Sequence, residues 1–164
     1  MSDKLTELAA DVGALLLARR QKVLTVESCT GGGIAEALTR IPGSSGWFER
    51  AWITYSNAAK AEEVGVPEAV LRDYGAVSNE VVSAMVNGAL AKVQDAWAVA
   101  VSGIAGPDGG SAAKPVGTVW IAWSGPGPMG TVSQDFLFKG DRAAVRQQTV
   151  EAALRGLKIL VGNS

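Results

Sequence analysis

Residues 25–38, TVESCTGGGIAEAL, join a short strand-like run to a helical pattern through three consecutive glycines. Ser28, Cys29 and Thr30 come before these glycines, so two hydroxyls and a thiol fall on the turn. In open α/β sheets, turns of this kind lie at the carboxyl ends of strands, where ligands bind. Two interpretations follow. Either the glycines serve only the backbone, with Ser28 or Thr30 as a helix cap, or the backbone and Ser28 face a ligand.

Hydrophobic periodicity extends the alternation of strands and helices along the chain. Strands are expected at residues 22–26, 50–56, 96–103, 118–124 and 131–139. Helices are expected at residues 3–20, 32–40, 57–65, 67–75, 79–94 and from 142 to about 160, with Asn57, Ser78 and Asp141 as caps and Pro67 at a first helical position. We expect a single domain over residues 1–164, an α/β fold in which a three-layer α/β/α sandwich surrounds a mixed sheet of about five strands. The order of the strands stays open.

Composition limits the partners of this chain. It has 164 residues, 48% of them hydrophobic and 19% charged, which is ordinary for a globular domain. The net charge of −1 gives no general basic footprint for nucleic acid. No apolar run approaches the roughly 18 residues of a membrane span. The first 20 residues read as an amphipathic helix rather than a signal peptide, and with one cysteine we expect a cytoplasmic protein.

Two scarce residue types limit the chemistry. The chain has no histidine, which excludes Ser-His-Asp and Cys-His catalysis and histidine metal sites. Its single cysteine excludes thiolate zinc sites and CxxC redox chemistry. Cys29 is either a small packing residue or, by its position, a reactive thiol.

A second candidate site is the stretch ITYSNAAK, residues 53–60. If the strands at 22–26 and 50–56 are neighbours, Lys60 and Ser28 lie at one edge of the sheet. A serine nucleophile without histidine needs another base, and lysine can serve if its pKa falls from about 10.4 toward roughly 7–8. Tyr55 is then placed to relay or donate a proton. The alternative is a capped surface helix with a solvated Lys60.

Two further segments carry polar groups next to glycines. The segment from Ser102 to 118 is rich in glycine and proline, and its backbone amides with Lys114 suit an anionic or amide-bearing ligand. The alternative is a mobile surface loop. In KGDR, residues 139–142, Arg142 either clamps a phosphate or carboxylate or lies free on a capped helix.

Several of these segments together resemble the C-terminal domain of the competence/damage-inducible CinA family. The matching segments, in the order of the family, are ESCTGGGIAEALTRIPGSS, YSNAAK, GVPEAVL, YGAVSNEVVSAM, VSGIAGPDGG, KPVGTVWIA and GDR, spanning residues 24–155. The chain looks like the stand-alone form, which is associated with nicotinamide-nucleotide amidohydrolase (NMN deamidase) activity. The resemblance implies hydrolysis of the carboxamide of nicotinamide mononucleotide to nicotinic acid mononucleotide and ammonia, without a metal or organic cofactor.

The resemblance and the residues together give a mechanistic hypothesis. Ser28 attacks the carboxamide carbon, Lys60 takes its proton, and Tyr55 assists. The other residues expected to bind the oxyanion or the substrate are Thr30, Gly31, Gly32, Asn57, Ser102, Gly103, Gly106, Lys114 and Arg142.

The alternative is a non-catalytic nucleotide-binding or regulatory module linked to competence or DNA damage. It predicts stabilisation by ligand without turnover. We expect a small-molecule nucleotide substrate, no nucleic acid, no membrane, and a homo-oligomer such as a dimer.

Overall fold

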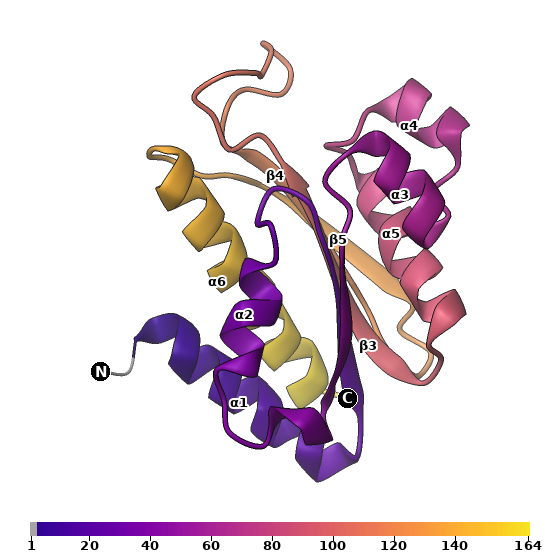
Figure 1. The fold of residues 1–164 in the computed structure, drawn as a ribbon, viewed down its shortest axis with the longest axis vertical. Coiled ribbons are helices and arrows are strands. Elements are labelled where there is room, and N and C mark those ends of the chain that lie inside the picture. The colour runs from indigo at the N-terminus through magenta and orange to yellow at the C-terminus, as the bar shows by residue number, and fades with distance from the viewer. Residues whose placement is uncertain (1–2) are drawn as a thin grey trace.

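A five-stranded sheet lies between two layers of helices in the computed structural model, which describes residues 3–164 (Figure 1). The strands are β1 (Lys22–Glu27), β2 (Phe48–Ile53), β3 (Ala96–Gly103), β4 (Thr118–Ser124) and β5 (Thr131–Leu137). The helices are α1 (Lys4–Arg19), α2 (Gly33–Thr39), α3 (Asn57–Val64), α4 (Glu68–Tyr74), α5 (Asn79–Lys92) and α6 (Arg142–Gly162), with a 3₁₀ turn at Ser44–Gly46. The predicted α/β class and the predicted order of elements are confirmed.

The strand order is β2-β1-β3-β4-β5, which the sequence left open. β1 pairs in parallel with both β2 and β3, while β4 and β5 extend the sheet by antiparallel pairing. From β1 the chain passes through α2 to β2 on one side, and then through α3, α4 and α5 to β3 on the other side. The carboxyl end of β1 is thus a point where the chain connections diverge, and such points form ligand crevices in α/β sheets.

Each face of the sheet has its own helical layer and its own core. In Figure 1, α1, α2 and α6 cover one face, and α3, α4 and α5 cover the other. Side chains alternate along β1: Val23 belongs to the core under α1 and α6, while Leu24 and Val26 belong to the core under α5. The second and last turns of α1 add Leu8 and Leu16 to the first core. Each helical layer buries apolar surface against its face of the sheet, so the sandwich has two separate hydrophobic cores.

The second strand differs from its prediction in position and in burial. It spans Phe48–Ile53 rather than 50–56, and it is a half-exposed edge strand rather than a buried one. After Ile53 the chain leaves the sheet, and the carbonyl oxygens of Thr54 and Tyr55 accept hydrogen bonds from Lys60 instead of from a strand. Ser56 rather than Asn57 caps α3, because Ser56 Oγ accepts a hydrogen bond from the Ala59 amide at 3.0 Å.

The remaining boundaries shift by a few residues. Pro67 is the residue before the first turn of α4, β5 ends at Leu137, and α5 ends at Lys92. The predicted caps of α5 and α6 are confirmed, since Ser78 accepts from the Val81 amide and Asp141 from the Ala144 amide. Within residues 3–164, no helix combines the length and the apolar character needed to cross a membrane.

Candidate active site

The carboxyl ends of β1, β2 and β3 open into a cavity of about 290 Å³. Residues from the three strand ends, the α3 segment, the loop after β3 and the start of α6 line it: Ser28, Cys29, Tyr55, Lys60, Ala76, Val77, Ser102, Gly103, Ile104, Ala105, Gly106, Asp108, Gly109, Gly110 and Arg142. In Figure 1 the loop that follows β3 projects above this edge of the sheet.

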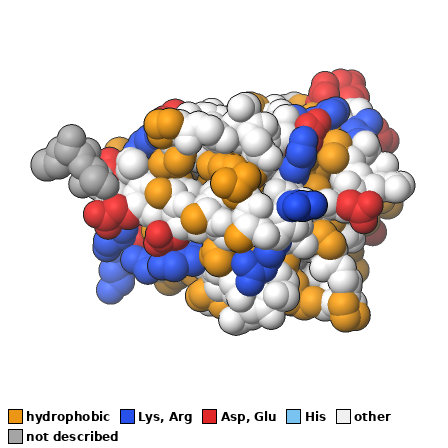
Figure 2. All heavy atoms as spheres, turned by 90° about the horizontal axis from the view of Figure 1, so that it is seen from below, with side chains coloured by type: hydrophobic (Ala, Val, Ile, Leu, Met, Phe, Trp, Pro, Cys, Tyr) orange, Lys and Arg blue, Asp and Glu red, His pale blue; other side chains and the backbone are white. Residues whose placement is uncertain are grey.

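A larger pocket of about 670 Å³ lies at the opposite end of the sheet, next to Trp97, Met129 and Asn163. Figure 2 shows the molecule from below, where hydrophobic side chains lie among charged ones. Most of this lining is apolar, and the Ser28 and Lys60 pair lies in the other cavity. The pocket near Trp97 is the larger of the two, but we take the smaller cavity as the candidate active site because it contains Ser28 and Lys60.

Ser28 and Lys60 meet inside the small cavity. Lys60 Nζ donates to Ser28 Oγ at 3.0 Å, to the Thr54 carbonyl at 2.9 Å and to the Tyr55 carbonyl at 3.0 Å. The lysine is 1% exposed and the serine 7% exposed. An ammonium has three donors and no acceptor, so three acceptors fully occupy it. Three contacts therefore fix the orientation of the amine relative to the hydroxyl.

The surroundings of Lys60 disfavour its charge. Burial lowers the pKa of Lys60 from 10.5 to about 8, and no carboxylate within the described chain forms an ion pair with it. A lysine whose pKa is near 8 is partly neutral at physiological pH. A general base at neutral pH needs a pKa in this range, and the role of Lys60 as that base stays a prediction.

Tyr55 contributes its backbone and its side chain at two different places. Its carbonyl oxygen holds Lys60, and its hydroxyl accepts a hydrogen bond from Arg142 Nη2 at 2.9 Å. Arg142 Nη1 also donates to the carbonyl of Gly106 at 2.9 Å. The Tyr55 side chain is 58% exposed, so its hydroxyl lies at the mouth of the cavity with Arg142. This network joins the start of α3, the loop after β3 and the first turn of α6.

The expected oxyanion site at Thr30, Gly31 and Gly32 is not formed in this way. The Gly31 amide donates to the Ser28 carbonyl at 3.0 Å, and none of the three residues lines the cavity. The first amides of α2 do not face a ligand either, because Ile34 and Ala35 donate to the carboxylate of Glu27. Protein groups already occupy the amides of Gly31, Ile34 and Ala35 in this structure, and the oxyanion role expected for Thr30, Gly31 and Gly32 stays a prediction.

Of the other predicted binding residues, some lie at the cavity and others do not. Ser102, Gly103 and Gly106 line the cavity at the end of β3. Asn57 lies on the exposed first turn of α3, outside this cavity. The Lys114 ammonium is bonded to the Tyr74 carbonyl at 2.8 Å, which keeps it out of the lining. The structure thus places Asn57 and Lys114 outside this cavity, and their binding roles stay predictions.

Glu27 and Arg146, which were not among the predicted site residues, support the Ser28 turn. Glu27 is fully buried and accepts four hydrogen bonds. Arg146 donates through Nε to the Cys29 carbonyl at 3.1 Å and through Nη2 to the Thr30 carbonyl at 3.2 Å. One signal in the sequence could have indicated Glu27: it is an acid at the end of an apolar strand. The helix that follows is preceded by Gly32, which has no side chain to cap it. Arg146 had no such signal, because its contact spans more than a hundred residues.

Cys29 is a packing residue in this structure. Burial raises the pKa of its thiol to about 11, so the thiol stays protonated. A protonated, buried thiol is a poor nucleophile, which leaves the hydroxyl of Ser28 as the candidate. Among the residues that the structure describes, no three His, Cys, Asp or Glu side chains gather in a way that could hold a metal ion.

Fold and site together define an α/β protein with a serine and a buried lysine at a divergence point of its sheet. The chain belongs to the CinA family, since the model of the CinA C-terminal domain matches residues 5–161. The resemblance drawn from the sequence is confirmed.

Similar proteins cover almost the whole chain. It is 59% identical over 155 residues to the nicotinamide-nucleotide amidohydrolase PncC of Pseudomonas putida, covering 94% of this chain and 96% of the relative. It is 51% identical over 154 residues to PncC of Escherichia coli K12, covering 94% and 93%. The crystal structure of the competence/damage inducible protein CihA from Agrobacterium tumefaciens superposes with a TM-score of 0.92 at 40% identity, covering 99% of this chain and 98% of that one.

Proposed function

We propose that this protein hydrolyses the carboxamide of nicotinamide mononucleotide to nicotinic acid mononucleotide and ammonia, with Ser28 as nucleophile and Lys60 as base. The amidohydrolase activity is supported by the names of relatives that share 51–59% of their residues with nearly the whole chain. The single observation that carries the mechanism is the 3.0 Å contact between Ser28 Oγ and Lys60 Nζ in a buried cavity.

The carbonyls around Lys60 orient its amine for proton transfer from Ser28. In the neutral amine, two N–H groups donate to the Thr54 and Tyr55 carbonyls, and the lone pair then faces Ser28. Lys60 removes the hydroxyl proton as Ser28 Oγ attacks the carboxamide carbon. The resulting ammonium donates that proton to the amide nitrogen, so ammonia leaves and an acyl-serine ester remains. Lys60 then takes a proton from water, the hydroxide attacks the ester carbon, and the Lys60 ammonium returns this proton to Ser28 Oγ as the ester bond breaks.

Binding of the charged parts of the substrate falls to the mouth of the cavity. Arg142 lies on the lining, and it has no carboxylate partner in the described part of the chain, so its guanidinium suits the phosphate. The backbone of the loop after β3 also lines the cavity and is our candidate for the oxyanion and ribose contacts. Neither proposed binding group includes the start of α2, because the amides of Ile34 and Ala35 donate to the Glu27 carboxylate.

Ammonia release from nicotinamide mononucleotide tests this function, measured for wild type, Ser28→Ala and Cys29→Ala with a chelator present. We expect Ser28→Ala to lose at least about 10³-fold in turnover, because removing a catalytic nucleophile in comparable enzymes costs far more than a neighbouring packing residue. Cys29→Ala keeps most of the activity. Equal losses in the two variants contradict the role of Ser28.

The same assay separates an enzyme from the non-catalytic nucleotide-binding module. The module predicts a raised melting temperature with the nucleotide but no ammonia. The cytoplasmic location and the homo-oligomeric state stay predictions.

A further inference from the structure

Glu27 is a buried carboxylate that the proposed reaction does not use. It is the last residue of β1, directly precedes Ser28 in the chain, and is 0% exposed. Its Oε1 accepts from Thr30 Oγ1 at 2.6 Å and from the Ile34 amide at 2.9 Å. Its Oε2 accepts from Thr25 Oγ1 at 3.0 Å and from the Ala35 amide at 2.9 Å. All four partners donate, which matches the four acceptor positions of an ionised carboxylate.

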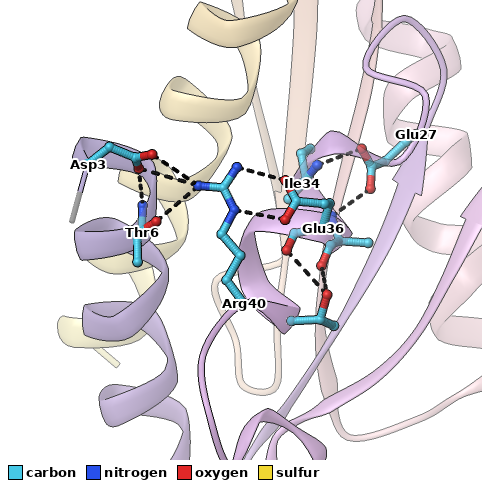
Figure 3. A network of polar contacts seen from close by, with 8 residues as sticks. Asp3, Thr6, Glu27, Ile34, Glu36 and Arg40 are labelled. Carbon is cyan, nitrogen blue, oxygen red and sulfur yellow. Dashed lines mark hydrogen bonds and ion pairs between the residues drawn. The ribbon is translucent and has the colours of Figure 1, made fainter. Parts of the chain in front are cut away.

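No lysine or arginine within residues 3–164 forms an ion pair with this carboxylate. Its counter-charge is the amino-terminal end of α2 together with two hydroxyls. Figure 3 shows Glu27 facing the first turn of α2, with a dashed line to Ile34. The residue before this helix, Gly32, has φ 101° and offers no side chain as a cap. Glu27 therefore caps α2 from the preceding strand.

The contacts of Glu27 enclose the turn that carries Ser28. Thr30 is bonded to Glu27 from within the turn, and the amide of Ser28 donates to the Val101 carbonyl at 3.2 Å. With one end of the turn held by the sheet and the other by the start of α2, the backbone of Ser28 has a fixed position relative to β2 and Lys60. The geometry points to Glu27 as a positioning residue for the proposed reaction: by holding the start of α2 it keeps Ser28 Oγ within reach of Lys60 Nζ. This inference rests on the proposed role of Ser28.

The experiment compares Glu27→Gln with Glu36→Gln. Both substitutions remove one carboxylate from the α2 region, but Glu36 is exposed and pairs only with Arg40 at the far end of the helix (Figure 3). In Glu27→Gln an NH2 group replaces one carboxylate oxygen, and this donor then faces two other hydrogen-bond donors. Two readouts are taken on folded protein: kcat and KM for nicotinamide mononucleotide, and the rate at which a fluorophosphonate probe labels Ser28. In that labelling, Ser28 Oγ bonds to phosphorus, fluoride leaves and Lys60 takes the proton.

We expect Glu27→Gln to lower kcat and the labelling rate together by roughly 10- to 100-fold, with KM changed by less than about 3-fold. Glu36→Gln leaves all three values unchanged. If folded Glu27→Gln labels and turns over at the wild-type rate, Glu27 only stabilises the fold and the inference is overturned.

Two further outcomes are decided in the same way. If Glu27→Gln does not fold, Thr30→Val, which removes one donor and keeps the carboxylate, decides: a fall of about 3- to 10-fold in both rates supports the inference, and unchanged rates overturn it. If the wild type is labelled at Ser28 but releases no ammonia, the substrate assignment fails while the labelling rates still test Glu27. If the wild type releases ammonia without labelling at Ser28, both the nucleophile and the role of Glu27 fail.

Discussion

Lys60 lacks a carboxylate partner within the described chain, and this sets the pH dependence of the proposed reaction. Its pKa is about 8 in the folded protein because burial disfavours the ammonium, and only the neutral amine can accept the proton of Ser28. We expect kcat/KM to rise about tenfold per pH unit below pH 8 and to level off above it. A pH–rate profile between pH 6 and 9.5 measures this, and Lys60→Arg serves as the control because arginine stays charged at every pH tested. A flat profile contradicts the role of Lys60 as the base.

Replacing either of two buried threonines near the site by valine is expected to change the stability of the protein, in opposite directions. Thr54 Oγ1 is buried without a hydrogen-bond partner in the described structure, whereas Thr25 Oγ1 donates to Glu27. We expect Thr54→Val to stabilise the protein by up to about 1 kcal/mol, because valine removes an unsatisfied hydroxyl at constant shape. Thr25→Val is expected to destabilise it by about 1–3 kcal/mol, because it deprives a buried carboxylate of a donor. Urea unfolding measures both, and a loss of stability in Thr54→Val would mean that this hydroxyl has a partner in solution.

The proximity of Lys60 and Ser28 is the part of the site that the sequence predicted and the structure confirms. The absence of histidine led to lysine as the base, and the parallel strands brought Lys60 to Ser28 as expected. The hydrogen-bond partners of Gly31 and Lys114 could not be predicted, because several acceptors compete for each donor and only the folded geometry selects one. The roles of the site residues in catalysis stay predictions.

At the scale of elements, the contact between α3 and α5 depends on a glycine. A Cβ atom at Gly88, in the middle of α5, would overlap the carbonyl oxygen of Val64 at the end of α3. Helix propensity alone predicts that Gly88→Ala stabilises by about 1 kcal/mol. We expect the opposite sign, a loss of about 1–3 kcal/mol, because a backbone atom of a packed helix must move.

Gly162→Ala at the end of α6 is the matched control. The added methyl meets only Leu15 Cδ1, at 3.7 Å, which is ordinary contact, and we expect a change within about 0.5 kcal/mol. Chemical denaturation of both variants gives the comparison. If Gly88→Ala is as stable as the wild type, the two helices are less closely packed than the structure describes.

Element boundaries were predictable where a local signal existed. Ser78 and Asp141 are caps followed by helical periodicity, and both helices begin there. The end of β2 was not predictable from periodicity, because Thr54, Tyr55 and Ser56 continue a strand-like pattern. Beyond Ile53 the carbonyls of Thr54 and Tyr55 accept hydrogen bonds from the Lys60 amine, a contact that periodicity does not reveal.

At the scale of the whole molecule, α1 and α6 form one layer although they come from opposite ends of the chain. Leu8, Val12 and Leu16 of α1 are buried in the shared core. Each buried side chain of this kind contributes about 1.5–3 kcal/mol, and a domain is stable by only about 5–15 kcal/mol. We therefore expect a variant that begins at residue 21 to lose its cooperative thermal transition in circular dichroism. Leu17→Ala is the control, since Leu17 on the same helix is 62% exposed; a cooperative transition in the truncated chain contradicts the expectation.

The layers and the mixed sheet followed from the alternation of strands and helices, but the strand order did not. The connection from β2 to β3 contains three helices, and this length allows β3 to lie on either side of β1. The observed order places the apolar residues of β1 between two neighbours, which matches its nearly complete burial. The site lies at the end of β1 because β1 is placed between β2 and β3, and this strand order is a property of the whole sheet.

The pairing of the first helix with the last one also has a consequence in time. A ribosome that adds about 5–20 residues per second needs roughly 6–25 s to pass from the end of α1 at Arg19 to the start of α6 at Arg142. During this interval the apolar face of α1 can pack on α2, but its contacts with α6 cannot form. We therefore expect the layer formed by α1 and α6 to be completed only after α6 has been synthesised.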